Sequence, residues 1–278
     1  PIGMLADGAS LHLPNGNPLD VEEFADTTIL ANAIGHEGSV LDARNMGESN
    51  IWWAQTSELL STRLGINMSR QTIPLSAQVS TTLGGITTDG FGRAISGKWS
   101  RWFTGLYAAG DAACSGIHGA GMVAGNRLLD ALAGGAAAGE HAAQYASKAK
   151  FTGRSALETH LGSAEADLDF DMAGADEGPV QRTGVLSTKL SEIMNSKVGA
   201  IRDAAGLQKA AEELEALEGS AGKIHLDDNS RLFNTNLLDA LRLKAGIRLA
   251  KSTVHCALSR TESRGTHQRT DYLESDSD

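Results

Sequence analysis

Cysteine is scarce in this chain, and its two cysteines, Cys114 and Cys256, stand far apart. They form no paired-cysteine or cysteine–histidine spacing of the kind that holds a metal, so the sequence predicts no metal site. Two unpaired thiols are typical of a protein from a reducing compartment.

Long apolar runs and excess positive charge are also missing. No uninterrupted apolar run reaches the length of a membrane span, and the N-terminus lacks the basic-then-apolar order of a signal peptide. With 24 Lys and Arg against 34 Asp and Glu, the net charge is -10, which argues against a nucleic-acid partner because phosphate backbones need basic patches. The remaining composition, 41% hydrophobic and 21% charged over 278 residues, predicts a soluble globular protein of one large domain or two.

The most informative stretch runs from Gly105 to Gly139. A short apolar run, Leu106 to Ala109, stops at Gly110-Asp111, which predicts a buried parallel strand that delivers a carboxylate to its C-terminal edge. A glycine-rich turn follows, from Gly116 to Gly125. From Asn126 to about Tyr145 the sequence predicts a closely packed, buried helix. Its apolar residues at helical spacing are Leu128, Leu129, Leu132 and Ala136.

The order strand, acid, glycine turn, helix is typical of a nucleotide site. Glycines let backbone N–H groups approach a ligand, and a helix that starts near Gly125-Asn126 adds partial positive charge there. Either a phosphate or the pyrimidine edge of a reduced flavin fits such a place, with Asp111 accepting hydrogen bonds from ribose-type hydroxyls. The residues alone are equally compatible with a helix cap and turn glycines of any α/β protein.

Three ordered motifs carry a family resemblance. The segments GLYAAGD, HGAGMVAGNRLLD and GGAAAG, within Gly105 to Gly139, resemble the second flavin-contacting region of the fumarate reductase/succinate dehydrogenase flavoproteins, which include L-aspartate oxidase. Upstream, TTLGGITTDGFGRA (Thr81 to Ala94) resembles another family motif, and downstream ALSRTESRGTHQRTDY (Ala257 to Tyr272) resembles a third. The matches cover most of the chain from about Gln71 onward.

The resemblance implies an α/β fold class: the C-terminal part of an FAD-binding doubly wound domain with a remnant of a capping domain, followed by an α-helical C-terminal domain. The expected domains are residues 1–70, the remnant of the capping lid; residues 71–148, the C-terminal half of the FAD-binding domain; and residues 149–278, the helical domain. FAD is the implied cofactor. The implied cofactor-binding residues are Gly84, Gly85, Gly110, Asp111, Gly125, Asn126, Arg127 and Leu128.

For the substrate site, the resemblance gives both matches and departures. His118 keeps its family place and is a substrate-binding candidate. Ser80 stands where relatives have a carboxylate-binding histidine, and Met122 stands where they have an arginine clamp, a planar two-pronged donor that a thioether cannot replace. Arg127 is a new cation at the helix start. It is a candidate to replace the clamp, to lie by the flavin, or to face solvent.

Arg44 is the catalytic candidate by resemblance. In relatives, an arginine of the lid protonates substrate beside the flavin, and Arg44 lies in LDARNMGESNIWWAQ, the matching segment. Asn45 stands where an acid is usual. A surface or helix-capping arginine is an equally open reading of Arg44.

The remaining segments predict mainly helices. A helix is expected from Asn50 to Leu64, an extended segment with Pro74 at an edge from Gln71 to Val79, and a tight hairpin at Asp89-Gly90. Residues 147–178 are expected to form a polar connection. A helical pattern from Gly184 to Leu217 is then broken by Gly219 to Gly222. Asn234-Thr235 predicts a cap for a helix with a core stripe of Leu238, Leu241, Ala245, Leu249 and Cys256.

The closing run alternates in charge: Arg260, Glu262, Arg264, His267, Arg269 and Asp271. One interpretation is a solvated helix end with weak surface ion pairs. The resemblance implies instead a segment packed back near the flavin domain and an iron–sulfur partner. Structural support is the expected role for these residues, rather than catalysis.

Three functions follow as hypotheses. The first is the flavoprotein subunit of a succinate dehydrogenase or fumarate reductase complex, which transfers hydride between FAD and a dicarboxylate and passes electrons to an iron–sulfur subunit, with membrane-anchor subunits as further partners. The expected location is the cytoplasm or, through partner subunits, the inner face of the cell membrane. The second is a diverged FAD oxidoreductase of this family with another substrate, which Ser80 and Met122 favour. The third is a catalytically silent interaction module.

The chain is expected to be a fragment. It begins at Pro1, and it contains no GxGxxG loop of the kind that opens relatives and holds the ADP pyrophosphate. We therefore expect it to be the C-terminal portion of a longer flavoprotein.

Overall fold

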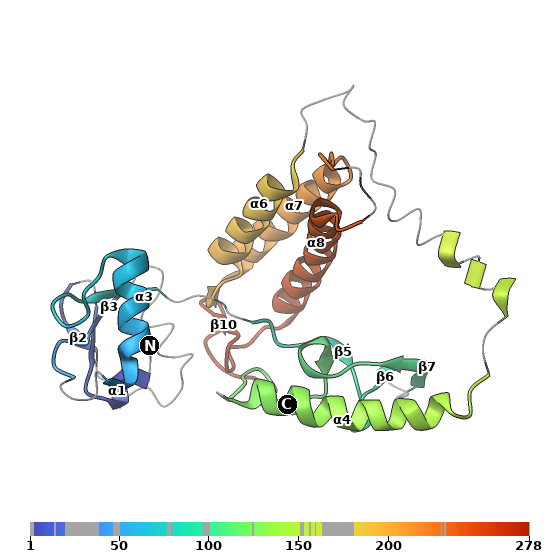
Figure 1. Cartoon of the computed structure of the whole chain (residues 1–278), viewed down its shortest axis with the longest axis horizontal. Helices are drawn as coiled ribbons and strands as arrows, with labels where there is room; N and C mark the ends of the chain where they lie inside the picture. Colours follow the sequence, from blue (N-terminus) through green and yellow to red (C-terminus); the bar gives the residue numbers. More distant parts are fainter. Residues whose placement is uncertain are drawn as a thin grey trace. The chain divides into compact units, whose positions relative to one another are not determined.

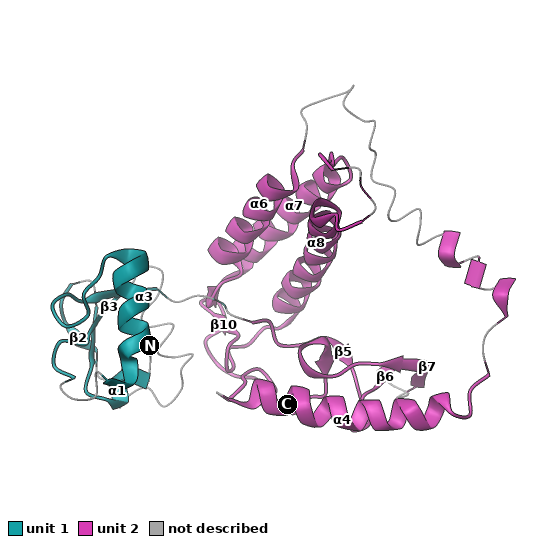
Figure 2. Ribbon diagram, viewed as in Figure 1, with its two compact units in different colours: residues 1–79 teal, residues 80–278 magenta. Residues whose placement is uncertain are grey.

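The computed structural model describes residues 3–13, 15–19, 39–46, 51–76, 79, 81–96, 101–123, 125–150, 153–155, 157–158, 160–162, 181–228, 230 and 232–277. The chain divides into two compact units, residues 1–79 and residues 80–278 (Figure 2). Each unit has a hydrophobic core of its own. The boundaries of the three expected domains are not resolved by this division, and they stay predictions.

In its described residues, the first unit is a small sheet with two α-helices (Figure 1). Its four strands are antiparallel and lie in the order β2-β1-β3-β4. The core beneath them consists mainly of Met4, Leu11, Leu41, Met68 and Ile73, each at most 5% exposed. The elements are α1 (Gly3–Ala6), β1 (Ser10–His12), β2 (Pro18–Leu19), β3 (Ser39–Asp42), α3 (Ala54–Leu64) and β4 (Ile73–Leu75).

Two sequence expectations for this unit are confirmed. Strand β4 lies at the edge of the sheet and pairs with β3 on one side. At an edge, the missing backbone N–H of Pro74 costs no hydrogen bond to another strand. The helix expected over residues 50–64 is α3, which begins at Ala54 and ends where Gly65 adopts a left-handed conformation, φ 68°. Such a glycine closes the last turn of a helix at little steric cost.

The second unit begins with short strands and one long helix. Strands β6 and β7 form an antiparallel hairpin, whereas β5 and β8 pair in parallel. In Figure 1, α4 is the long light-green helix that runs along these strands, and its main contacts in the described chain are with η3 and β7. The elements are β5 (Ile86–Thr87), β6 (Arg93–Ser96), β7 (Arg101–Tyr107), the 3-10 helix η3 (Gly110–Ala112), β8 (Ala113–Cys114) and α4 (Asn126–Ala146).

The tight turn expected at Asp89-Gly90 is confirmed. The backbone N–H of Gly92 donates to the carbonyl oxygen of Asp89 at 3.0 Å, and the Asp89 carboxylate accepts from the N–H groups of Phe91 and Arg93. The Asp89 side chain also accepts from Arg93 Nε at 2.6 Å. These bonds lead the chain from β5 into β6.

The strand expected at Leu106 to Ala109 is only partly correct. A strand is present, but β7 is antiparallel to β6 and mostly exposed, and the parallel pair is formed instead by β5 and β8. The apolar run was too short to distinguish a strand that enters a sheet from one that ends a hairpin.

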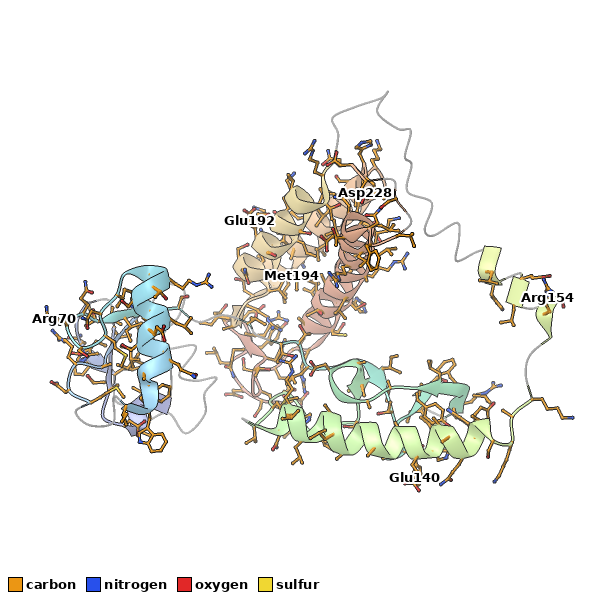
Figure 3. The ribbon with its side chains drawn as sticks, viewed as in Figure 1. Arg70, Glu140, Arg154, Glu192, Met194 and Asp228 are labelled. Atoms are coloured by element: carbon orange, nitrogen blue, oxygen red, sulfur yellow. The ribbon has the colours of Figure 1, made fainter. Side chains whose placement is uncertain are left out.

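Helix α4 has the expected bounds but not the expected burial. Of its residues, all of which the structure describes, Ala138 alone is buried. The leucines expected in the core, Leu128, Leu129 and Leu132, are 62% to 68% exposed. The helix touches its strand neighbours mainly along the other side, where aromatic rings of β7 meet it. On the side away from those strands Figure 3 shows Glu140.

The aromatic contacts between β7 and α4 are specific. The ring of Trp102 packs edge-on against Tyr107 and Tyr145, with centroids 5.8 and 5.1 Å apart. The hydroxyl of Tyr107 hydrogen bonds His141 Nδ1 at 2.8 Å. Offset and edge-to-face ring pairs add stability beyond their buried area, so this cluster fixes the C-terminal half of α4.

The last part of the second unit is a three-helix bundle. Helices α6, α7 and α8 pack on one another around a continuous apolar cluster, toward which Met194 of α6 projects (Figure 3). Two short parallel strands, β9 and β10, tie the chain after α8 back to the bundle. The elements are α6 (Thr183–Lys197), β9 (Ile201–Arg202), α7 (Ala204–Ala221), α8 (Thr235–Ser259) and β10 (Gln268–Arg269).

The sequence expectations for the bundle are mixed. The cap at Asn234 is confirmed, because its side chain accepts from the N–H of Leu237 at 2.8 Å. The helical pattern from residue 184 to 217 is two helices, and α7 continues through Gly219 to Ala221. The core stripe expected on α8 is on the wrong face: Leu238 and Leu249 are 49% and 58% exposed. The buried face is Ala240, Leu243, Ile247, Ala250, Val254 and Ala257.

Helix α8 carries two apolar stripes, and periodicity alone does not say which faces α6 and α7. In the described part of the chain, no helix has both the length and the apolar character needed to cross a bilayer.

Candidate functional site

The glycine turn before α4 is built from consecutive tight turns. The N–H of Gly119 donates to the carbonyl oxygen of Gly116, and the N–H of Gly121 donates to that of His118. Gly125, with φ 86°, then precedes the first turn of α4 and offers no side chain to cap it. Free N–H groups at an uncapped helix start attract negative charge.

Two glycines allow close packing around η3: Gly85 lets the chain before β5 approach it, and Gly110 lets it approach α4. Gly85 has φ 143°, and a Cβ built on it would lie 2.5 Å from the carbonyl oxygen of Ala112. Gly110 has φ 60° and packs against Ala131 of α4. Gly84, with φ 122°, has open space where its side chain would be. The backbone here has the close approach and the open edge that a flat cofactor needs.

Asp111 and Arg127, both expected at the cofactor, bind each other. Arg127 Nε donates to Asp111 Oδ1 and Oδ2 at 3.0 and 2.9 Å, and Arg127 Nη2 also donates to Oδ2. The hydrogen bond from Arg127 lowers the pKa of Asp111, and the bond to Asp111 raises the pKa of Arg127. Both side chains are about half exposed, at 55% for Arg127 and 47% for Asp111. The sequence did not indicate this pair.

His118 lies beside Asp130, a residue that the sequence interpretation missed. His118 Nε2 is buried and 3.3 Å from Asp130 Oδ2, within ion-pair range but not aligned for a hydrogen bond. Asp130 lies one turn into α4, four residues after Asn126, so an acid on the first turns of the helix was the available signal. The pair gives His118 a fixed acidic neighbour.

These groups surround a small hollow of about 40 Å³. Its walls come from the residues before β5, from η3 and β8, and from the glycine turn. At this size it admits an edge of a ligand rather than a whole ring system, so a larger cofactor would lie against its open side. The lining residues are Thr82, Leu83, Gly84, Gly110, Asp111, Ala113, Cys114, Ser115, Gly116, His118, Gly119, Met122 and Asp130.

Two other site residues were expected from the sequence, Ser80 and Arg44. Ser80 falls outside the described residues. Arg44 belongs to the unit of residues 1–79 and donates to Asp42 from Nε at 2.8 Å and from Nη2 at 2.6 Å. The hydrogen bond from Arg44 lowers the pKa of Asp42 to about 2. Arg44 is therefore ion-paired and half exposed, and its catalytic role stays a prediction.

Half of the residues of the alternating run after α8 are buried, so the solvated interpretation was wrong for those three. Glu262, His267 and Arg269 are 7%, 6% and 3% exposed. Glu262 accepts from Arg260 and Arg264, and these bonds together with the N–H of Asp276 lower its pKa to about 2. Charge alternation signals a surface only when the partners are other surface groups, whereas here they are backbone and neighbouring side chains.

Arg269 shows how the segment is held. Its guanidinium donates to Asp271, at 2.8 and 2.6 Å, and to the carbonyl oxygen of Ala257 in α8 at 2.9 Å. It also lies over the ring of Tyr272, 4.9 Å from the centroid. A buried arginine with this many partners anchors the segment to the bundle.

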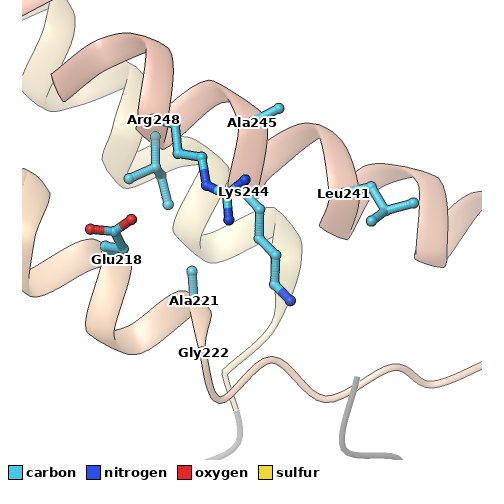
Figure 4. Close-up of a pocket in the computed structure, with 8 residues that line it drawn as sticks. Glu218, Ala221, Gly222, Leu241, Lys244, Ala245 and Arg248 are labelled. Atoms are coloured by element: carbon cyan, nitrogen blue, oxygen red, sulfur yellow. The ribbon is translucent and has the colours of Figure 1, made fainter. Parts of the chain in front are cut away.

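A second, larger hollow of about 310 Å³ lies between the end of α7 and α8 (Figure 4). Glu218 of α7 projects into it opposite Arg248 of α8. Glu218 already accepts from Lys251 at 2.5 Å. None of the site residues expected from the sequence lines this hollow, whose walls are helix side chains: Glu218, Ala221, Gly222, Leu241, Lys244, Ala245, Ile247 and Arg248.

Comparisons with known proteins identify the two parts of the chain. Residues 25–128 match the family model described as an FAD binding domain, and residues 187–278 match that described as the fumarate reductase flavoprotein C-terminus. The chain is 33% identical over 257 residues to the fumarate reductase flavoprotein subunit of Haemophilus influenzae. The chain belongs to the fumarate reductase/succinate dehydrogenase flavoprotein family.

Other comparisons agree with this family. The chain is 30% identical over 223 residues to the succinate dehydrogenase flavoprotein subunit of Coxiella burnetii. This match covers 79% of the chain and 37% of the Coxiella protein. It superposes on a solved quinol–fumarate reductase with menaquinol molecules at a TM-score of 0.86 and 26% identity, covering 99% of this chain and 52% of that one. The match to the Haemophilus protein takes in 92% of this chain and 41% of the relative, so the chain spans less than half of the curated relatives it matches.

The family membership confirms the α/β fold class, with an FAD-binding part followed by a helical C-terminal part. It also confirms FAD as the cofactor of the matched domain. The residues around the small hollow fit this cofactor, because Gly84 leaves open space at its edge and Asp111 of its wall binds Arg127 in the first turn of α4, which has no side-chain cap. The individual roles of these residues are not tested by the comparisons.

Proposed function

We propose that this chain is part of the flavoprotein subunit of a fumarate reductase or succinate dehydrogenase complex. The observation that carries the proposal is the glycine-lined hollow next to the uncapped start of α4, within a segment that matches an FAD-binding domain. The reaction would be hydride transfer between FAD and a dicarboxylate. Electrons would pass to an iron–sulfur subunit, with membrane-anchor subunits holding the complex at the inner face of the cell membrane.

Bound FAD would supply the hydride chemistry. The chain's own contribution is placement and charge. Gly84, Gly85 and Gly110 would let the backbone approach the cofactor, and the N–H groups of Arg127 and Leu128 would face an electron-rich edge of the flavin, whereas that of Asn126 donates to the carbonyl oxygen of Val123. Asp111 is available to a ribose hydroxyl only through the oxygen lone pairs that Arg127 leaves free.

His118 is the substrate-binding candidate in this scheme. Its acidic neighbour Asp130, 3.3 Å from His118 Nε2, would hold the imidazole in one orientation at the hollow. Arg44, held by Asp42, stays the candidate for the residue that donates the proton to the substrate.

A second candidate, a diverged substrate, is favoured by the lining of the hollow. Among the described residues that line it there is no arginine or lysine, and Met122 occupies the wall where relatives are expected to clamp a carboxylate. Arg127 is already paired with Asp111. A substrate with one carboxylate, or with none, would fit this wall better than a C4-dicarboxylate.

The deciding experiment is a flavin spectrum followed by substrate reaction. We expect the longer flavoprotein of which this chain is proposed to be a part, produced with FAD, to show a flavin visible band that succinate bleaches and fumarate restores. A flavin band that responds to neither would support the diverged-substrate candidate. Absence of any bound flavin would overturn both and support an interaction module.

A further inference from the structure

One carbonyl oxygen joins the two parts of the chain that match different family models. The carbonyl oxygen of Ala120, in the glycine turn, accepts two hydrogen bonds from Thr266, in the closing segment. The donors are the backbone N–H and the side-chain Oγ1 of Thr266, each at 2.7 Å. A carbonyl oxygen has two lone pairs, so both bonds can form at once.

The same contact is also sterically tight. Gly265 has φ 54°, and a Cβ built on it would lie 2.6 Å from the Ala120 carbonyl oxygen. The two backbones therefore meet without any side chain between them. The glycine turn cannot shift toward the closing segment without a clash, and it cannot shift away without losing both hydrogen bonds.

The closing segment holds the backbone on both sides of Thr266 in place. Its neighbour His267 is buried, and the backbones of Arg264 and His267 exchange hydrogen bonds of 2.8 and 3.0 Å around it. Arg269 anchors the same segment to the carbonyl oxygen of Ala257 in α8. The bundle thus serves as the fixed side of the contact, while Thr266 itself is exposed.

The glycine turn is the side that carries functional groups. His118 lies two residues before Ala120 and Met122 two residues after it, and both line the small hollow. Among the described residues, two backbone bonds close the turn around Ala120, from Gly119 to Gly116 and from Gly121 to His118, and a third, from Asn126 to Val123, closes its end. The hydrogen bonds that Thr266 donates to Ala120 therefore help to fix the positions of the His118 and Met122 side chains.

We propose that Thr266 is a positioning residue for the glycine turn, and that its hydroxyl keeps His118 and Met122 in place at the ligand hollow. The consequence for substrate rests on the proposed function. The consequence for the turn itself does not, because it follows from the contact alone.

The test compares four proteins by hydrogen exchange of the peptide that covers residues 116–122. Thr266→Val removes the hydroxyl and keeps the branched shape, whereas Thr266→Ser keeps the hydroxyl. Thr270→Val is the matched control, since Thr270 is an exposed residue of the same segment whose Oγ1 lies a long 3.5 Å from the carbonyl oxygen of Arg202. We expect exchange in this peptide to rise about fivefold in Thr266→Val and to stay at the wild-type rate in the other two.

In the flavin-loaded protein the same variants separate positioning from general stability. We expect Thr266→Val to raise KM for fumarate about fivefold with kcat within about twofold, and Thr266→Ser to restore the wild-type KM. Wild-type exchange in Thr266→Val, or an equal rise in Thr270→Val, would overturn the role of Thr266. If the wild-type protein binds no flavin, the proposed function fails, and the exchange comparison still decides on Thr266.

Discussion

Arg127 holds both carboxylate oxygens of Asp111, and through this pair the cation at the start of α4 is neutralised before any ligand arrives. The two residues were expected to serve a cofactor or substrate separately. Their pairing means that a change to one alters the charge that the other presents.

Removing the acid should therefore expose the cation. In the flavin-loaded protein we expect Asp111→Asn to tighten binding of malonate, a simple dicarboxylate probe, by roughly threefold, because charges that are about half exposed are screened by solvent. Arg127→Gln should weaken it, and the double variant should match Arg127→Gln. Spectral titration of the flavin measures all three. Loss of bound FAD in Asp111→Asn alone would show instead that Asp111 serves the cofactor.

The glycine pair before β5 offers a matched steric test. Gly84 and Gly85 both have positive φ, but only a side chain at Gly85 would strike backbone, at the carbonyl of Ala112. We expect Gly84→Ala to cost about 1 kcal/mol of unfolding free energy and Gly85→Ala more than about 2 kcal/mol, measured by urea titration. Equal costs would mean that β5 and η3 move apart easily and that the close contact is not needed.

Met122 allows a gain-of-binding test. If the hollow takes a dicarboxylate, Met122→Arg should lower KM for fumarate about tenfold, because a guanidinium binds a carboxylate through two parallel hydrogen bonds. Met122→Lys, which brings a single charge without that fork, should give a smaller gain. Steady-state reoxidation of reduced flavin measures both. No gain from either variant would favour a substrate without a second carboxylate.

His267 predicts a pH dependence of stability. Burial lowers its pKa below the ordinary value of 6.5, and the nearby charges of Arg202, Arg260 and Arg269 act in the same direction, against a hydrogen bond to the Arg260 carbonyl that raises it. As pH falls below about 6.5, the unfolded chain takes up a proton that the native imidazole resists, so the native state loses stability. Above that pH both forms are neutral and this contribution is flat.

Urea unfolding at intervals between pH 7.5 and 5 measures this effect. We expect His267→Gln to remove part of the fall in midpoint that the wild type shows below pH 6.5. His255→Gln, at an exposed position of α8, is the control and should leave the slope unchanged. An identical slope in wild type and His267→Gln would contradict the prediction.

The sequence predicted elements and motifs better than faces and partners. The bounds of α4, the cap at Asn234 and the turn at Asp89 follow from the conformational preferences of residues that are close together in the sequence. The family followed from ordered motifs. The buried face of α8 could not be predicted, because two apolar stripes share that helix and only packing against α6 and α7 selects one.

The site residues illustrate the same limit. Asp111 and Arg127 are 16 positions apart in the sequence and belong to different elements. Their pairing therefore depends on how η3 packs against α4. The contact between Ala120 and Thr266 spans 146 positions and includes a backbone oxygen, which leaves no mark on residue type. Gly265 is the one residue whose type reflects the contact, and a glycine occurs at a position for several different structural reasons.

The uncovered leucines of α4 bear on how the chain behaves in solution. Leu128, Leu129 and Leu132 form an exposed hydrophobic patch on α4. Such patches on different molecules associate with one another as protein concentration rises. The net charge of -10 opposes this by mutual repulsion, which salt weakens. Dilute, low-salt buffer should therefore keep the chain dispersed, whereas concentrated samples at high ionic strength should form oligomers.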